Sequence, residues 1–168
     1  MSFSYNLKRL LSYIYPIHIE TRQSDVSGQL EVSFQYGKLV LDTASANYSH
    51  GSLHNVFQQV IHQFNFNPER KNTLILGFGA GSIARILNQE KHLDLDIDGV
   101  ELDPTVLDLY HEYFELSITN KIQLYNIAAI NYLEKCSKHY DYIFIDVFEN
   151  LNVPEEIIST HFVKLLQK

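Results

Sequence analysis

After a short leading segment, residues 17–43 alternate between hydrophobic and polar side chains. From Ile17 the alternating segments are IHIETRQ, QLEVSFQYG and KLVLDT, separated by turn residues, and this pattern predicts a β-hairpin or a three-strand meander. Gly37 fits a tight turn position that needs a positive φ. Residues 3–13, ahead of the alternation, could form a short amphipathic helix or an arm.

Beyond the meander the pattern changes to alternating strands and helices. The apolar run TLILGF is typical of a strand buried on both faces. The other expected strands are 96–101, 122–126 and 140–147, and the expected helices are 49–65, 82–89, 104–116, 128–137 and 154–166. This alternation indicates right-handed βαβ units. The predicted fold class is α/β: a Rossmann-like parallel sheet with helices on both faces, preceded by the N-terminal hairpin or meander.

Length and composition fit one compact unit with two parts. The 168 residues suffice for a single domain. We expect an N-terminal arm and hairpin at residues 1–48 and a nucleoside-binding domain at 49–168. The net charge is −7 and no basic block is present, which argues against a nucleic-acid partner. The single cysteine, Cys136, excludes an intramolecular disulfide.

Targeting signals are not evident. The apolar run after Lys8 and Arg9 is short, holds Pro16 and lacks a small-residue cleavage site, so we do not interpret it as a signal peptide. No stretch approaches the length of a membrane span. We therefore expect a cytoplasmic protein without a membrane partner.

Candidate chemistry begins at the segment LILGFGAGSIARIL. Gly77, Gly79 and Gly81 lie between a predicted strand and helix, where they allow a sharp turn and close approach of a ligand to the backbone. Glu101 ends the next strand, where a carboxylate can accept both ribose hydroxyls, and Asp103 precedes the proline that opens the next helix. The pattern predicts a nucleoside pocket. The alternative is that the glycines only make a tight turn and Glu101 is a surface acid.

Five segments resemble the spermidine synthase family of aminopropyltransferases, within the class I S-adenosylmethionine-dependent methyltransferase fold. They are QLEVSFQYGKLVLDT, LILGFGAGSIARIL, GVELDPTVLDLYHEYF, YDYIFIDVFE and NVPEEIISTHFVKLL. The resemblance implies that the glycine turn lies beneath the methionine part of S-adenosylmethionine or its decarboxylated form. It also implies that Glu101 and Asp103 belong to the cofactor site, with Glu101 on the ribose. Asp146 would position or deprotonate the attacking amine, such as that of a polyamine.

The sequence departs from the family's pattern at several positions. The acid inside the glycine turn is replaced by Ala80, the acid after the third strand falls at Ala128, and the Y-H-E helix motif becomes the Val-Phe-Gln of residues 56–58. After the fourth strand only Glu149 can serve as a second acid beside Asp146. Because a dicationic substrate needs opposite charge in its channel, these losses predict weak or absent spermidine synthase activity.

Several functions therefore stay open. The first is a transferase that uses S-adenosylmethionine or its decarboxylated form. The second is a catalytically inactive pseudoenzyme or dimeric interaction module that keeps the fold. The third is a nicotinamide-dependent oxidoreductase, although GFGAGS does not give the usual G-x-G-x-x-G spacing. His50, His54 and His62 share helical spacing, but no carboxylate or cysteine completes a ligand set, so we expect no metal site.

The expected position of the fourth strand at an edge of the sheet suggests that the chain associates with a second copy. The family's pattern continues with a fifth strand, whereas this sequence ends at Lys168. Four parallel strands in the order 3-2-1-4 leave the fourth, the apolar YIFIDV, at an edge of the sheet, which is an association hazard. We therefore expect a homodimer, the simplest closed assembly.

Overall fold

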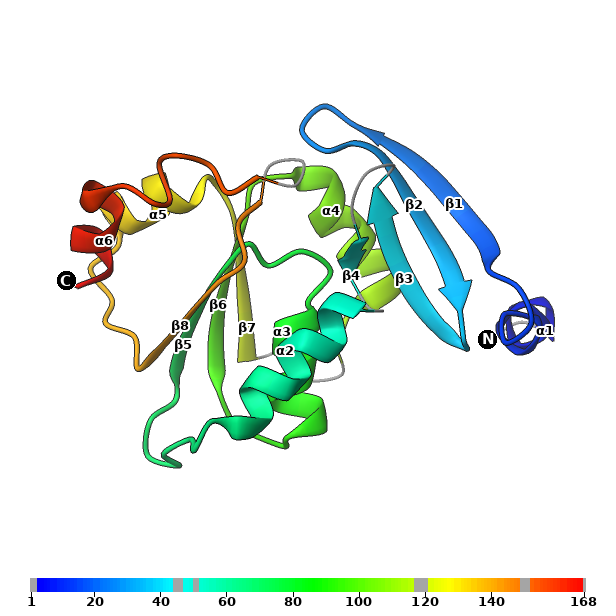
Figure 1. Ribbon diagram of the computed structural model, residues 1–168, viewed down its shortest axis with the longest axis horizontal. Helices are drawn as coiled ribbons and strands as arrows, with labels where there is room; N and C mark the ends of the chain where they lie inside the picture. The colour runs from blue at the N-terminus through cyan, green and yellow to red at the C-terminus, as the bar shows by residue number, and fades with distance from the viewer. Residues whose placement is uncertain (1–2, 44–46, 50–51, 117–120, 149–151, 168) are drawn as a thin grey trace.

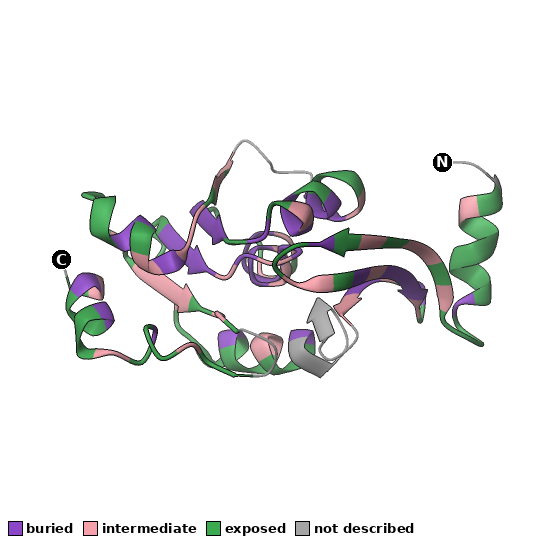
Figure 2. Ribbon diagram, turned by 90° about the horizontal axis from the view of Figure 1, so that it is seen from above, coloured by how far each residue is buried: buried purple, intermediate pink, exposed green. Residues whose placement is uncertain are grey.

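The computed structural model describes residues 3–43, 47–49, 52–116, 121–148 and 152–167. In these residues an antiparallel sheet is followed along the chain by a parallel sheet, with four strands in each (Figure 1). Buried residues concentrate in the parallel sheet, in the helices against it and on one side of the antiparallel sheet (Figure 2).

The N-terminal part forms the predicted helix and meander, with one strand more than expected. Its elements are α1 (Phe3–Leu11), β1 (Ile17–Ser24), β2 (Gly28–Gln35), β3 (Lys38–Thr43) and β4 (Asn47–Ser49), and the strands pair in the order β1-β2-β3-β4. Tyr36 and Gly37 make the two-residue turn between β2 and β3, with φ values of 50° and 75°. These positive φ values match the turn that suits a twisted hairpin, and they confirm the expectation for Gly37.

The second part is the predicted parallel sheet. Its strands are β5 (Asn72–Leu76), β6 (Asp96–Glu101), β7 (Ile122–Asn126) and β8 (Tyr142–Ile145), in the order β7-β6-β5-β8. The helices are α2 (Ser52–Gln63), α3 (Ser82–Arg85), α4 (Pro104–Leu109), α5 (Ala129–Lys135) and α6 (Thr160–Leu166). Two of them continue as π-helical turns, α3 into η1 (Ile86–Glu90) and α4 into η2 (Tyr110–Phe114). When β5, β6, β7 and β8 are numbered 1 to 4 along the chain, their order in the sheet is 3-2-1-4, which confirms the prediction.

Some boundaries differ from the expectation. β5 ends at Leu76, because Gly77 has a φ of 83° and leaves the strand conformation. The last helix begins at Thr160 and not at residue 154, because Ser159 is extended and its hydroxyl accepts the N–H of Phe162, which caps the helix there. The short β4 crosses the division expected between residues 48 and 49.

Both faces of the parallel sheet are covered. Leu74 and Leu76 of β5 pack with α5 and α6, whereas Ile75 packs with the core formed by α2, α3, η1, α4 and η2. This division follows from the alternation of side chains along a strand. Within the described residues no helix is both long and apolar enough to cross a membrane.

The two sheets are joined by polar contacts between β1 and the helix that follows β6. The Ser24 hydroxyl at the end of β1 donates to Asp103 Oδ2 at 2.5 Å, and Asp103 Oδ1 accepts the N–H of Thr105 at 2.8 Å. Arg22 in β1 pairs with Glu112 of η2 at 2.8 Å. These contacts fix the meander against α4 and η2, beside the carboxyl end of β6 (Figure 1).

Candidate functional site

The candidate site lies where the carboxyl ends of β5, β6 and β8 meet. The chain begins the parallel sheet at β5, adds β6 and β7 on one side, and then places β8 on the other side of β5. In open α/β sheets, ligands bind beyond the carboxyl ends of the strands at such a reversal of strand order. The topology therefore points to the turn after β5 and its neighbours.

Gly77 begins this turn at a place with no room for a side chain. Its φ is 83°, and a Cβ atom at Gly77 would lie 2.1 Å from the backbone oxygen of Asp146. The N–H of Asp146 in turn donates to the Leu76 oxygen at 2.8 Å. The backbones of the β5 and β8 ends are thus in direct contact, and only glycine is compatible with both the φ and the spacing.

Glu101 ties the glycine turn to the end of β6. Its side chain is buried, with 7 % of the residue exposed. One carboxylate oxygen accepts the N–H of Gly79 at 2.8 Å, and the other accepts the N–H of Asp103 at 3.0 Å. Burial raises the pKa of Glu101, against the opposing effect of these two backbone donors. The residue that the sequence assigned to the ribose therefore also shapes the turn.

Asp146 supplies a second carboxylate close to the first. It follows β8 and is half-buried. Burial, and after it the nearby charge of Glu101, raises the pKa of Asp146 from 3.8 to about 6. Two carboxylates near one turn, in partly desolvated surroundings, favour a cationic group between them. Gly77, Gly79, Glu101 and Asp146 are thus brought together at one end of the sheet.

Asp103 has a different environment. It is 0 % exposed. Burial acts to raise its pKa, but hydrogen bonds from Ser24 and Ser27 and from the first backbone N–H groups of α4 outweigh burial and lower the pKa. The carboxylate caps α4 and holds the end of β1. The sequence placed Asp103 in the cofactor site, and the structure places its side chain in this buried junction behind Glu101.

Alanines occupy the positions of two acids in the family's pattern. Ala80 is buried in the turn, with 1 % exposed, and Ala128 precedes α5 without a side-chain cap. Beneath the turn, a Cβ atom at Gly81 would come within 2.9 Å of the Tyr110 ring, which packs edge-on against Phe78 with ring centroids 5.0 Å apart. The space under the turn is therefore filled by aromatic rings.

The remaining candidates stand apart from this site. Glu149 and His50 lie outside the described residues. His54 is buried on α2 and bonds Glu90 at 3.1 Å. Over the described ranges no group of three or more metal-ligating side chains comes together. The link that sequence reasoning missed is Ser24, whose place at the end of a strand before a turn gives no sign of its contact with Asp103.

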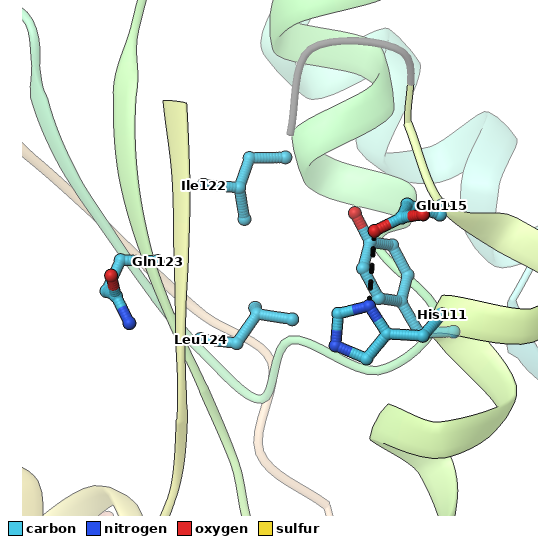
Figure 3. A pocket seen from close by; sticks show the side chains of 6 residues that line it. His111, Glu115, Ile122, Gln123 and Leu124 are labelled. Carbon is cyan, nitrogen blue, oxygen red and sulfur yellow. Dashed lines mark hydrogen bonds and ion pairs between the residues drawn. The ribbon is translucent and has the colours of Figure 1, made fainter. Parts of the chain in front are cut away.

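Two cavities lie away from the carboxyl ends of β5, β6 and β8. One of about 260 Å³ lies beside β7, and Figure 3 shows Ile122 and Leu124 pointing into it while Gln123 points to the other side of the strand. The His111 ring bonds Glu115 at its border, at 3.3 Å. The other, about 250 Å³, is lined by residues of α5, α6 and the start of β8. Neither includes the glycine turn or its carboxylates, so the site assignment depends on topology and side-chain chemistry.

Residues 45–168 match the model of the spermine/spermidine synthase domain. The chain belongs to the spermine/spermidine synthase family. The family's polyamine aminopropyltransferase from Vibrio vulnificus (strain CMCP6) is 29 % identical over 104 residues, which are 58 % of this chain and 33 % of the relative. A probable polyamine aminopropyl transferase from Bifidobacterium longum (strain NCC 2705) is 32 % identical over 97 residues, 58 % of this chain and 21 % of the relative.

A longer match extends into the N-terminal sheet. The polyamine aminopropyltransferase from Alkaliphilus metalliredigens (strain QYMF) is 25 % identical over 159 residues, 90 % of this chain and 55 % of the relative. The chain thus spans from about a fifth to about half of the length of these curated relatives.

Solved structures show the same fold. A probable spermidine synthase from Corynebacterium glutamicum superposes with a TM-score of 0.72 at 16 % identity, covering 87 % of this chain and 58 % of that one. Human methyltransferase-like protein 13, in complex with SAH, superposes with a TM-score of 0.56 at 19 % identity, covering 70 % of this chain and 60 % of that one. The predicted methyltransferase-like fold is confirmed.

Proposed function

We propose that the chain binds S-adenosylmethionine, its decarboxylated form or methylthioadenosine across the carboxyl ends of β5, β6 and β8. The observation that carries the proposal is the placement of two carboxylates, Glu101 and Asp146, on either side of a glycine turn without room for a side chain. Membership of the spermine/spermidine synthase family supports it. The structure of human methyltransferase-like protein 13 in complex with SAH, which has this fold, also supports it.

Each residue has a proposed role in that complex. The turn of Gly77, Gly79 and Gly81 would lie beneath the methionine part. Glu101 has lone pairs beyond the two that its backbone donors use, and these would accept the ribose hydroxyls. Asp103 acts as a positioning residue, since its N–H orients Glu101.

Asp146 is proposed to act on an amine. In aminopropyl transfer the amine nitrogen would attack the carbon next to the sulfonium sulfur, and the carbon–sulfur bond would break to release methylthioadenosine. Asp146 would orient the amine and accept its proton. A pKa near 6 leaves this carboxylate mostly ionised at neutral pH and still able to accept a proton.

The second candidate is a nucleoside-binding protein without this activity. The buried Ala80 and the uncapped Ala128 favour it, because neither can supply the carboxylate of the family's pattern. We expect little or no spermidine formation from putrescine and decarboxylated S-adenosylmethionine. A turnover of about 1 s⁻¹ or more, in the ordinary range of enzymes, would contradict this expectation.

We also propose a cytoplasmic homodimer. Ile145 at the end of β8 and Phe148 just after it are 43 % and 54 % exposed, at the outer strand of the sheet. Apolar side chains on an edge strand favour association. Sedimentation equilibrium at low micromolar concentration tests this, and a monomer of 19.5 kDa would contradict it.

The site proposal is tested by calorimetry with methylthioadenosine. Glu101→Ala removes the acceptor of the ribose hydroxyls and should weaken binding by about 1.5–3 kcal/mol, which is at least tenfold. Glu69→Ala, in the exposed loop before β5, is the matched control and should bind like wild type. Because Glu101 also anchors Gly79, the melting curve of the variant must first show a folded protein at the temperature of the titration. If folded Glu101→Ala binds as tightly as wild type, the site assignment is wrong.

A further inference from the structure

One face of helix α1 is docked on the rest of the chain. The Tyr5 ring packs edge-on against Phe34, with centroids 5.0 Å apart. Arg9 Nε donates to the Gly37 oxygen at 3.0 Å, and the Ser12 hydroxyl, just after α1, accepts the Gly37 N–H at 2.9 Å. Tyr5, Arg9 and Ser12 are spaced i, i+4 and i+7, so they line one side of the helix. That side is docked on the turn between β2 and β3.

The opposite side of α1 is apolar and uncovered. Leu7, Leu10, Leu11 and Ile14 are 46 %, 67 %, 46 % and 87 % exposed. Leu7, Leu10 and Leu11 are spaced i, i+3 and i+4, so they form one stripe about 100° wide on α1, the pattern that a helix normally buries, and Ile14 follows in the turn after the helix. The contacts of Tyr5, Arg9 and Ser12 on the opposite side of the helix fix the direction in which this stripe points. The stripe therefore faces away from the protein's own core.

The N-terminal segment that contains α1 also differs in charge from the rest of the chain. Residues 1–19 contain Lys8, Arg9 and no Asp or Glu, whereas the other 149 residues contain 11 basic and 20 acidic residues, a net −9. The uncovered apolar stripe therefore lies in a segment whose net charge is +2, in a protein that is acidic as a whole. A cationic helix with an apolar stripe is typical of segments that lie in the boundary between lipid headgroups and acyl chains.

The position of α1 permits contact with a flat surface. Figure 1 shows α1 at one end of the molecule, beyond the meander and opposite to the C-terminus, and Figure 2 shows most of its surface exposed. Tyr13, Tyr15 and Tyr36 around it are 59 %, 73 % and 75 % exposed. Tyrosine has an apolar ring and a polar hydroxyl, which suits it to the membrane–water boundary. The acidic parallel-sheet domain lies away from this end.

We propose that α1 attaches this end of the protein to the surface of a bilayer that contains anionic lipids. The apolar stripe enters the headgroup boundary, and Lys8 lies near lipid phosphates. Surface attachment needs no membrane span, so it revises only the expectation that the protein has no membrane partner. The proposal is independent of the nucleoside site.

A second copy of the chain fits this stripe less well. Nine helical residues, at a rise of about 1.5 Å each, make a patch about 13 Å long and about 10 Å wide. This is far below the roughly 800 Å² that each partner contributes to a stable protein interface. Two such helices would also bring their Lys8 charges toward each other. A bilayer instead offers negative charge, and one short helix gives it weak, reversible attachment.

The first test uses a single tryptophan as a reporter. The natural chain has no tryptophan, so Ile14→Trp in the full chain reports on the stripe alone. With phosphatidylcholine vesicles that contain about 30 % phosphatidylglycerol, we expect blue-shifted emission and quenching by brominated acyl chains, and neither with pure phosphatidylcholine. The control is Val26→Trp, at the far end of the β1–β2 hairpin and 52 % exposed, whose emission should not change. Unchanged Ile14→Trp emission with anionic vesicles would overturn the proposal.

The second test is co-sedimentation with the same vesicles, and its variants avoid added aromatic area. Lys8→Gln should weaken binding about fivefold, because a basic residue at an anionic surface contributes about 1 kcal/mol. Leu10→Ser should weaken it more than tenfold. The control Val163→Ser, 47 % exposed on α6, should bind like the natural chain. Equal binding by all variants overturns the proposal. The proposal is also overturned if the natural chain does not bind vesicles and forms a dimer that Leu10→Ser converts to a monomer. That result would assign the stripe to a second copy of the chain.

Discussion

Replacing Asp146 by asparagine should stabilise the protein at high pH and not at low pH. In the folded chain the pKa of Asp146 is about 6, compared with the ordinary 3.8, because burial and the charge of Glu101 disfavour the ionised form. The interval between these values corresponds to about 3 kcal/mol, at about 1.4 kcal/mol per pH unit. This is an upper bound on what ionised Asp146 costs the fold.

The direction with pH follows from proton binding. Between pH 3.8 and about 6 the folded chain binds a proton at Asp146 that the unfolded chain has released. The free energy of unfolding therefore falls as the pH rises through this window, and the loss is complete above it. Asparagine has nearly the same shape and stays neutral, so Asp146→Asn avoids the loss. We expect the variant to exceed wild type by about 1–3 kcal/mol at about pH 8 and to gain nothing at about pH 3.5.

Urea unfolding followed by circular dichroism at four pH values between these limits measures the difference directly. Asp108→Asn, an exposed carboxylate on α4, is the matched control and should change the free energy of unfolding little at any pH. A gain that grows with pH only for Asp146→Asn supports the raised pKa of Asp146 beside Glu101. A stability difference that is the same at every pH, or a loss at high pH, would contradict a raised pKa of Asp146 in the folded chain.

Three further predictions follow from the same contacts. Gly77→Ala should lose several kcal/mol of stability in urea unfolding, because its Cβ atom would meet the Asp146 backbone oxygen at 2.1 Å. The control is Gly28→Ala, which has a similar φ of 72° but open space around its Cβ position, and it should lose only about 1 kcal/mol. Ser24→Ala should cost about 1–3 kcal/mol in the same assay, since it removes a donor from the buried Asp103, and a loss near zero would show that the contact is unimportant. In calorimetry, the preference for S-adenosylmethionine over the uncharged methylthioadenosine should grow as the pH rises through about 6, where Asp146 becomes ionised, and a pH-independent preference would place that carboxylate away from the sulfonium.

Regular segments of the fold were predictable from sequence. β6 and β7 have the predicted bounds, because polar or turn residues flank both apolar segments. The end of β5 was predicted two residues too late, since Phe78 after Gly77 is as apolar as the strand and periodicity does not reveal a positive φ. β4 has three residues, too few for any alternation to be recognised.

The candidate site was only partly predictable. The position of Glu101 at the end of β6 follows from the pattern, because strand ends can be read from the sequence. Its hydrogen bond to Gly79 and the raised pKa of Asp146 depend on contacts between separate strands. Asp103 has the spacing of a site residue, yet its carboxylate turns to Ser24, which lies 79 positions earlier in the chain. Such long-range contacts leave no local signal.

The proposed adenosyl ligand would bind at the carboxyl ends of β5, β6 and β8. Thermal melting of the natural chain with S-adenosylmethionine, its decarboxylated form, methylthioadenosine and NAD tests for this binding. A ligand that binds only the folded state at about 100 times its dissociation constant stabilises the fold by about 2.7 kcal/mol, which raises the melting temperature by several degrees. We predict this rise for at least one of the three adenosyl ligands and none with NAD. A melting temperature that all three adenosyl ligands leave unchanged, or that only NAD raises, would contradict an adenosyl site in this chain.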